Sequence, residues 1–324
     1  MKKPLVPAAI ALLAVMWCAD VAAQAYPAKP VRWIVPYPPG GSTDVIARTA
    51  GRKLAEAWGV QVIIDNRPGA SGMIGTDIVA KSAPDGYTLA SVASSHVLHP
   101  SLYRQVPFNT INDFTQVILL VRSPNLMCVH PSLPVRSIQE LVALARARPG
   151  TIAYGVGGLG SSNHLGGEMF KSLAKINIIP IPYKGSAPAA IDAIGGQIPM
   201  LIQTITSAGP YVKGGKLRAL AVTSQKRFAG FADVPTVAES GFPGFDSFEW
   251  WGLLGPAGLP KDVLAKLNTD IDRVMNLADV QARFAEIGTS YIGGTPEQAG
   301  AFYRAEMAKW SKVAQAAEIG RAHV

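Results

Sequence analysis

Apolar positions along the chain come in short runs, separated by longer amphipathic stretches. In the N-terminal third, apolar runs at 31–36, 60–64 and 88–93 predict β-strands. A helix is expected at about 44–57, and a second helix follows the Gly-rich turn at 68–72. Strands joined by helices of this length predict an α/β fold with a doubly wound, mostly parallel sheet.

The same alternation begins again after residue 150. A helix is expected at 163–174, among strands predicted at 151–154, 178–181, 198–202 and 217–222. Beyond residue 260 the apolar spacing becomes helical, and Thr295 with Gln298 forms the capping-box pattern that begins a helix. The repetition predicts two similar units.

Two apolar segments, 116–129 and 248–254, are expected to cross between these units. About 300 of the 324 residues remain after the N-terminal segment described below, more than one hydrophobic core usually supports. We therefore predict a discontinuous first lobe and a continuous second lobe, with flanking helices in each. Their expected bounds are 26–122 with 250–317 for lobe 1, and 123–249 for lobe 2. Trp250 and Trp251, in the second crossing, are expected to be buried hinge and core residues rather than ligand-stacking residues.

The N-terminus has the pattern of an export signal. A basic start precedes an apolar run at 5–17, and Ala23-Gln24-Ala25 has the form that signal peptidase cleaves. The run is shorter than the ~20 residues of a membrane-spanning helix. We expect residues 1–25 to be a cleaved signal peptide and the mature chain to be periplasmic. The alternatives are a retained anchor helix and a lipid anchor on Cys18, where the bulky Trp17 is unfavourable.

Composition adds modest limits. Hydrophobic residues make up 48% and charged residues 16%, as in a well-packed globular protein. The formal charge is +8, but Lys and Arg are scattered, so the charge favours small anionic ligands over nucleic acid. Cys128 lies in an apolar run and is expected to be a buried, unreactive thiol. Residues 318–324 can be encoded by a common sequencing-adapter read, so we expect a non-native tail there.

Two glycine-rich turns carry the candidate chemistry. Ligands of open parallel sheets bind at the carboxyl ends of strands, beside helix N-termini that favour anions. The first turn, 37–44, contains glycines that permit close backbone approach and capping residues up to Asp44. A tight turn with an ordinary cap explains this pattern equally well. The second turn, 155–164, contains G-x-G-x-x-G, but no acidic residue ends the following strand. An anion at the N–H groups of Ser161 and Ser162 is favoured over a dinucleotide.

Signatures of enzymes and metal sites are mostly lacking in the sequence. There is no G-x-S-x-G, H-E-x-x-H or C-x-x-C pattern. His96 and His99 share a helical face but have no apparent third ligand, which favours packing or capping. A nucleophilic serine beside His164 would lack an orienting acid. We predict no catalytic residue, no metal and no cofactor.

Several ordered runs resemble one known family. The run P-Y-P-P-G-G-S-T-D at 36–44 resembles the hallmark of the Bug family, the extracytoplasmic receptors associated with tripartite tricarboxylate transporters. Further runs resemble the family's other signatures, at 66–75, 84–87, 182–185 and 216–223. The resemblance extends over essentially the whole mature chain.

The resemblance implies a two-lobed periplasmic-binding-protein fold, type II-like, that closes around one ligand. It also implies that the two turns hold a ligand carboxylate, with Ser94 and Ser95 facing the same cleft. The expected ligand-binding residues come from both lobes: Tyr37, Gly40, Gly41, Ser42, Asp44, Ser71, Ser94, Gly157, Gly158, Ser161, Ser162, His164 and Gln203.

One departure from the family pattern bears on the ligand. Gln203 stands where many members carry an acidic residue, which would select an amino group. We therefore predict a monomeric receptor for a non-amino mono- or dicarboxylate, serving the membrane subunits of a tripartite tricarboxylate transporter. One alternative is a sensing receptor for a signalling partner. The other is an exported hydrolase-like enzyme with His164 or Asp44 as its base.

Overall fold

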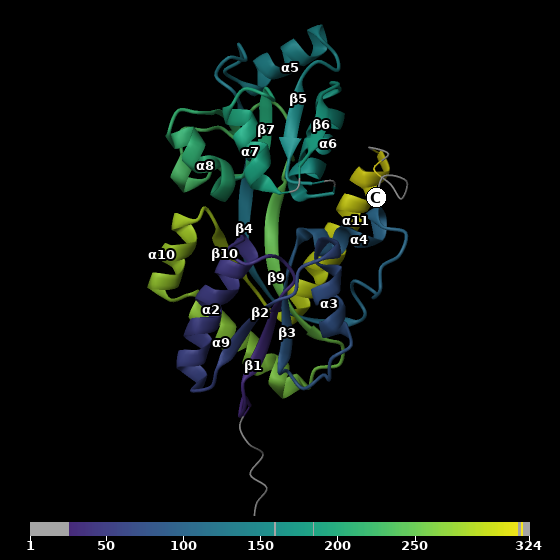
Figure 1. The fold of residues 1–324 in the computed structure, drawn as a ribbon, viewed down its shortest axis with the longest axis vertical. Helices are drawn as coiled ribbons and strands as arrows, with labels where there is room; N and C mark the ends of the chain where they lie inside the picture. Colours follow the sequence, from purple (N-terminus) through teal and green to yellow (C-terminus); the bar gives the residue numbers. More distant parts are fainter. Residues whose placement is uncertain (1–25, 159, 184, 317–318, 320–324) are drawn as a thin grey trace, which may run out of the picture.

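Two α/β lobes, one above the other in Figure 1, are joined by two long paired strands. The computed structural model describes residues 26–158, 160–183, 185–316 and 319. The predicted signal peptide and all of the predicted tail except Ile319 lie outside these residues. None of the helices within the described ranges is long and apolar enough to cross a membrane.

The joining strands are β4 (Phe114–Val129) and β9 (Phe248–Pro256), which pair antiparallel. Both were predicted as crossings, and β4 runs without interruption from one lobe into the other. In this pair Arg122 lies opposite Trp250 and Ser123 opposite Glu249. The two lobe boundaries proposed from the sequence, 122/123 and 249/250, therefore lie side by side on adjacent strands.

In lobe 1, a parallel group of three strands is extended by the crossing strands. The order is β2-β1-β3-β9-β4, with β10 on the other side of β4. The strands besides β4 and β9 are β1 (Val31–Val35), β2 (Val62–Asn66), β3 (Thr88–Ala93) and β10 (Ser290–Gly293). The helices are α2 (Ser42–Trp58), α3 (Met73–Ala80), α4 (His99–Leu102), α9 (Lys261–Met275), α10 (Ala278–Glu286) and α11 (Pro296–Ala316).

Lobe 2 has the same plan. Three parallel strands, β6-β5-β7, join β4, and β8 pairs with β4 as well. The strands are β5 (Ala153–Val156), β6 (Ile179–Pro182), β7 (Met200–Thr204) and β8 (Arg218–Val222). The helices are α5 (Ile138–Ala147), α6 (Ser162–Ala174), α7 (Ser186–Ile194) and α8 (Ile205–Lys213).

The predicted α/β class is confirmed, with one refinement of the sheets. Each lobe contains a parallel group of three strands, as the strand–helix alternation requires. The crossing strands pair antiparallel with these groups, so the sheets are mixed rather than mostly parallel. The direction of a crossing strand depends on how distant segments of the chain are connected. Local hydrophobic periodicity carries no information about these connections.

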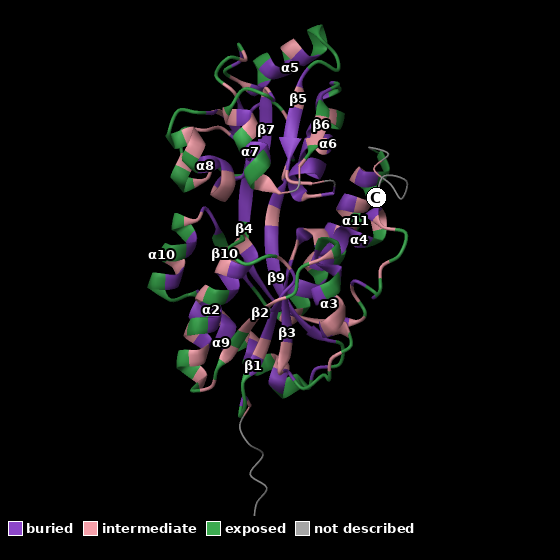
Figure 2. Ribbon diagram, in the orientation of Figure 1, coloured by how far each residue is buried: buried purple, intermediate pink, exposed green. Residues whose placement is uncertain are grey.

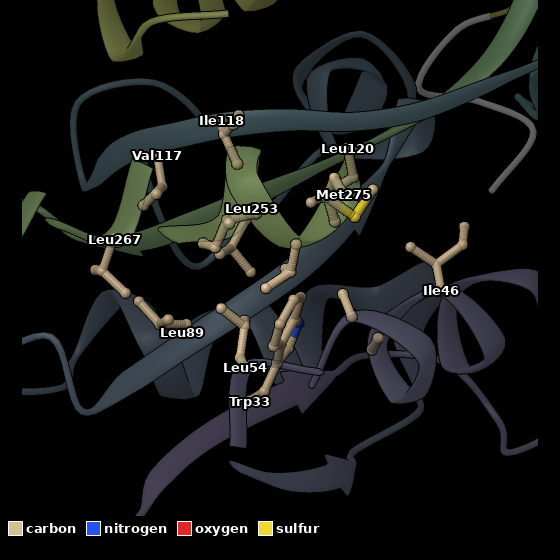
Figure 3. Close-up of a cluster of buried hydrophobic side chains, with 14 of the residues drawn as sticks. Trp33, Ile46, Leu54, Leu89, Val117, Ile118, Leu120, Leu253, Leu267 and Met275 are labelled. Atoms are coloured by element: carbon tan, nitrogen blue, oxygen red, sulfur yellow. The ribbon is translucent and has the colours of Figure 1, made fainter. Parts of the chain in front are cut away.

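Each lobe has its own apolar core. Figure 2 shows burial concentrated along the strands, with exposed positions on the outward helix faces. In lobe 1, Trp33, Leu54, Leu89, Leu253 and Leu267 converge beneath α2 and α9 (Figure 3). Each such side chain contributes ~1.5–3 kcal/mol by leaving water. Lobe 2 packs around Tyr154, Phe170 and Phe245.

Several local predictions are confirmed. Cys128 is fully buried, and burial raises the pKa of its thiol far above the usual value. Trp250 and Trp251 are buried core residues, whose indole N–H groups donate to Glu306 Oε2 and Thr43 Oγ1. The capping box is present, because Thr295 N–H donates to Gln298 Oε1 over 2.8 Å, and Gln298 N–H donates back to Thr295 Oγ1 over 3.3 Å.

Candidate functional site

The first turn connects β1 to α2 and is braced from within by Asp44. Asp44 Oδ2 accepts hydrogen bonds from Gly40 N–H and Arg48 Nε, each over 2.9 Å. Its Oδ1 accepts a third from Asn66 Nδ2 over 2.9 Å. Burial would raise the pKa of Asp44, but these three bonds hold it below its usual value. Asp44 is therefore an ionised carboxylate that stabilises the turn. Because both of its oxygens already accept hydrogen bonds, it is not suited to act as a general base.

This bracing leaves the start of α2 available to a ligand. Gly40 has φ +80°, and Gly41 precedes the helix in an extended conformation. Both glycines are exposed and Ser42 is half-buried. The first N–H groups of a helix have no intrahelical acceptor. Those of Ser42 and Thr43 also have no other partner within the described part of the chain. This helix end is electrostatically suited to an anion.

The second turn connects β5 to α6 and is held by its own side chains. Ser161 caps α6, because its Oγ accepts a hydrogen bond from His164 N–H and donates to Gly158 O over 2.6 Å. Gly160 N–H donates to His164 Nδ1 over 3.0 Å. That nitrogen must therefore be unprotonated, and burial lowers the pKa of His164. His164 is a neutral, buried brace of the turn.

A chain of amides fixes the orientation of Gln203, which is fully buried on β7. Asn163 Oδ1 accepts a hydrogen bond from Gly157 N–H over 3.3 Å. Its Nδ2 therefore points the other way and donates to Gln203 Oε1 over 2.9 Å. The remaining group, Gln203 Nε2, has no partner among the described residues. It lies beside Gly157, whose hypothetical Cβ would be 3.6 Å away.

Glu249 on β9 joins the two lobes at this site and was not predicted from the sequence. Its Oε1 accepts hydrogen bonds from the N–H and hydroxyl of Ser94, over 3.0 and 2.5 Å. Its Oε2 accepts the hydroxyl of Ser162, the first residue of α6, over 2.6 Å. The hydroxyl groups of both predicted serines are thus occupied by this carboxylate. Burial raises the pKa of Glu249, although the serine bonds oppose this.

Two tyrosine–serine pairs lie in lobe 1 at and near the first turn. Tyr37 OH and Ser95 Oγ are 2.9 Å apart, and Ser71 Oγ lies 2.6 Å from Tyr103 OH. Burial, with a smaller contribution from the charge of Glu249, raises the pKa of Tyr37 to about 12. Its hydroxyl therefore keeps its proton near neutral pH. Tyr37 of the first turn and Ser162 of the second are both neighbours of one carboxylate.

The lobes contact each other on both sides of this cluster. Gly160 packs so closely on Leu102 of α4 that a Cβ on the glycine would lie 2.0 Å from Leu102 Cδ1. On the other side, the Thr206 hydroxyl of α8 donates to Ile287 O after α10. Figure 1 shows the starts of α2 and α6 at the level where the lobes meet. The two predicted turns are therefore brought to one inter-lobe region.

Other candidate centres have ordinary structural explanations. His96 and His99 are buried, and their Nε2 atoms lie 2.9 and 3.2 Å from the carbonyl oxygens of Thr110 and Ser71. Burial lowers the pKa of His96 to about 3 and of His99 to about 4. Among the described residues, no group of three His, Cys, Asp or Glu side chains is placed to hold a metal ion. Packing, the favoured sequence interpretation, accounts for both histidines.

A separate groove of about 780 Å³ lies between α6 and α11. Apolar side chains line it together with four lysines, at positions Lys171, Lys175, Lys309 and Lys312. It contains none of the residues of the two turns. The candidate site therefore remains the inter-lobe region around Glu249.

Comparisons with known proteins agree with this architecture. The model of the tripartite tricarboxylate transporter family receptor matches residues 46–319. The protein BugT of Bordetella pertussis is 39% identical over 297 residues, covering 91% of this chain and 91% of BugT.

Solved structures match over the whole fold. One described as R. palustris Rpa4515 with adipate is 38% identical, with a TM-score of 0.82, covering 91% of this chain and 99% of that one. The periplasmic binding protein BugD is 31% identical, with a TM-score of 0.79, over 91% and 99% of the two chains. MatC from Rhodopseudomonas palustris with bound malate is 28% identical, with a TM-score of 0.77, over 89% and 99%.

These matches are to solute-binding receptors and not to enzymes. They extend over nine-tenths of the chain, at an identity that leaves no doubt about common descent. The chain belongs to the tripartite tricarboxylate transporter family receptors, the Bug-type solute-binding proteins.

Proposed function

We propose that this receptor binds a small, non-amino mono- or dicarboxylate between the turn at 37–44 and the turn at 157–164. Each turn begins a helix, and each helix start offers a positive dipole end and N–H groups that have no partner among the described residues. A carboxylate placed there touches both lobes. Two related structures have small dicarboxylates in their descriptions, adipate and malate.

The observation that carries the ligand class is the free amide donor of Gln203. Asn163 occupies its oxygen, so only Nε2 remains to meet a ligand. An unsatisfied buried donor costs ~1–3 kcal/mol, which an acceptor atom on the ligand recovers. A ligand oxygen meets that need and a ligand ammonium group does not. The site therefore favours carboxylates without an amino group.

Binding acts by stabilising one arrangement of the lobes. A ligand shifts a conformational equilibrium only as far as its affinities for the two states differ. A ligand held by α2 of lobe 1 and α6 of lobe 2 makes its full set of contacts only when the lobes are together. The crossing strands β4 and β9 are the covalent connections that must accommodate the movement.

The wider role follows from the family. We infer that residues 1–25 direct export and are cleaved, and that the mature chain is a periplasmic monomer. It delivers its ligand to membrane subunits of a tripartite tricarboxylate transporter. A sensing role would use the same cleft, and a pull-down against membranes with and without ligand distinguishes the two partners.

A thermal-shift screen of the chain from Tyr26 tests the function. The panel contains aliphatic, aromatic and amino carboxylates, with adipate and malate among them. A ligand at a hundred times its dissociation constant adds ~2.7 kcal/mol, and each kcal/mol moves the midpoint by ~2–4 °C at this size. We expect a shift of several degrees for at least one non-amino acid. Selective stabilisation by glutamate, or catalytic turnover of an ester panel, would contradict the proposal.

A further inference from the structure

Glu249 has no cationic partner among the described residues at the proposed anion site. Three hydrogen bonds from Ser94 and Ser162 solvate it, and none of the described lysines, arginines or histidines forms an ion pair with it. The side chain is only partly exposed. An anionic ligand that enters this cleft therefore meets another anion.

The described groups that contact or lie opposite Glu249 are neutral. Ser94 comes from the end of β3, Ser162 from α6, and Ser123 lies opposite on β4. Tyr37, from the turn after β1, keeps its proton because its pKa is raised to about 12. Trp250 contributes only its backbone N–H. Among the described residues, none forms an ion pair with Glu249 that would offset a second carboxylate.

The bond to Ser162 places the two anions close together. Ser162 is the first residue of α6, and its hydroxyl donates to Glu249 Oε2 over 2.6 Å. A ligand carboxylate at the N–H groups of this helix start would lie beside the Ser162 hydroxyl that Glu249 contacts. Two carboxylates in one site do not both stay ionised, and one of them takes up a proton.

We propose that Glu249 takes up one proton from solvent when a carboxylate binds at the start of α6, and that this frees the hydroxyl of Ser162 for the ligand. The neutral carboxyl group donates from Oε2 to Ser162 Oγ, so the hydroxyl turns and donates to a ligand oxygen. The proton returns to solvent when the ligand leaves. Carboxylate capture is thus coupled to proton uptake.

This inference rests on the proposed function and adds a property to the same site. It also explains how a carboxylate at this position is compatible with an anionic ligand. In the structure, Glu249 holds Ser94 of lobe 1 and Ser162 of lobe 2 on a single side chain. In the complex, the same side chain is neutral and Ser162 becomes a ligand donor.

Calorimetry with the strongest ligand of the carboxylate panel tests the coupling. Titrations in two buffers of different ionisation enthalpy give the protons taken up per ligand. The pH range is about 6 to 8, above the ~4 of ordinary carboxyl groups. We expect uptake of up to one proton and an affinity that falls with rising pH by at most about tenfold per unit.

Glu249→Gln mimics the protonated side chain, because its amide Nε2 donates to Ser162 permanently. We expect it to bind the ligand at least as tightly as the wild type at high pH, without proton uptake. Asp246→Asn is the matched control. Asp246 lies three residues earlier, burial also raises its pKa, and none of its hydrogen bonds involves Ser94 or Ser162. Its replacement leaves the proton uptake unchanged.

The outcomes separate this inference from the function beneath it. Wild-type binding with no proton uptake and a flat pH profile contradicts the coupling and leaves the receptor function standing. Equal uptake by the wild type and Glu249→Gln assigns the proton to another group and also contradicts it. If no acid binds the folded protein, the proposed function and the coupling both fail. If Glu249→Gln does not fold, an absence of proton uptake by the wild type still contradicts the coupling.

Discussion

Asn163 Nδ2 donates to Gln203 Oε1 over 2.9 Å, and this single bond decides which end of the Gln203 amide is free. Replacement of Gln203 by Glu exchanges a free donor for an acceptor without changing the length of the side chain. We expect Gln203→Glu to lose at least about tenfold in affinity for a dicarboxylate, or ~1.4 kcal/mol, because two anions then compete for the site. Calorimetry measures the loss.

The matched control for that substitution is Gln197→Glu. Gln197 is exposed in the turn before β7 and makes no side-chain hydrogen bond with a described residue of the cleft. The substitution Gln197→Glu adds the same charge outside the site. We expect it to leave the affinity within about twofold of the wild-type value, since exposed charges are screened. Equal losses in both variants would mean that general charge, and not the amide donor, controls binding.

A methyl group at Gly160 is expected to keep the lobes apart. The residue has φ +70°, and its new Cβ would lie 2.0 Å from Leu102 Cδ1. Gly160→Ala should weaken ligand binding at least several-fold, measured by titration, because the second turn then cannot seat against α4. Gly59→Ala is the control, since Gly59 has φ +69° but open space around it. That variant loses ~1 kcal/mol of stability through backbone strain alone.

Leu102→Ala tests whether the contact with Gly160 carries this effect. Removal of the leucine Cδ atoms makes room for the new methyl group. The double variant Gly160→Ala with Leu102→Ala should therefore bind the ligand more tightly than Gly160→Ala alone. If Leu102→Ala gives no recovery, backbone strain in the turn explains the loss, and the inter-lobe contact does not.

The two buried histidines predict loss of stability in acid. The pKa values of about 3 for His96 and about 4 for His99 lie below the ~6.5 of an unfolded histidine. Their contribution to the free energy of unfolding is complete above pH ~6.5. It is lost as the pH falls toward the pKa values of the folded protein, because the unfolded chain then binds protons that the folded chain does not. Urea titrations at several pH values should show this decline. His99→Gln, which retains a donor for Ser71, should flatten it, and an unchanged slope would assign the acid sensitivity elsewhere.

Cys128 should be inert toward thiol reagents in the folded protein. It is fully buried, and burial raises its pKa, so both access and thiolate formation are suppressed. In the native protein, labelling of Cys128 with a chromogenic disulfide should be limited by the rate at which the core of lobe 2 unfolds locally. In denaturant, labelling should be rapid. Fast labelling of the native protein would show that this core opens readily.

Much of the fold was predictable because the information is local. The strand–helix alternation, the glycines of the two turns, and the capping box at Thr295 are each encoded within a few residues. Antiparallel pairing of β4 and β9 was not predictable in this way, because it depends on segments more than a hundred residues apart.

The candidate site was predicted in its two turns and missed at its centre. Glu249 lies in a run that reads as an apolar crossing, and its partners Ser94 and Ser162 are 155 and 87 residues away. The only signal was a lone acid between aromatic residues, at a position where burial requires hydrogen-bond partners. Ser94 was expected to face the ligand, but its two donors are bonded to Glu249 in this structure.

Hydrogen–deuterium exchange with and without a bound dicarboxylate tests the central claim most directly. The claim is that one ligand is held by turns from both lobes at once. We predict that peptides covering 37–44 and 157–164 become protected together, with the same dependence on ligand concentration. Protection of only one turn, or of neither while the ligand binds, would contradict the account.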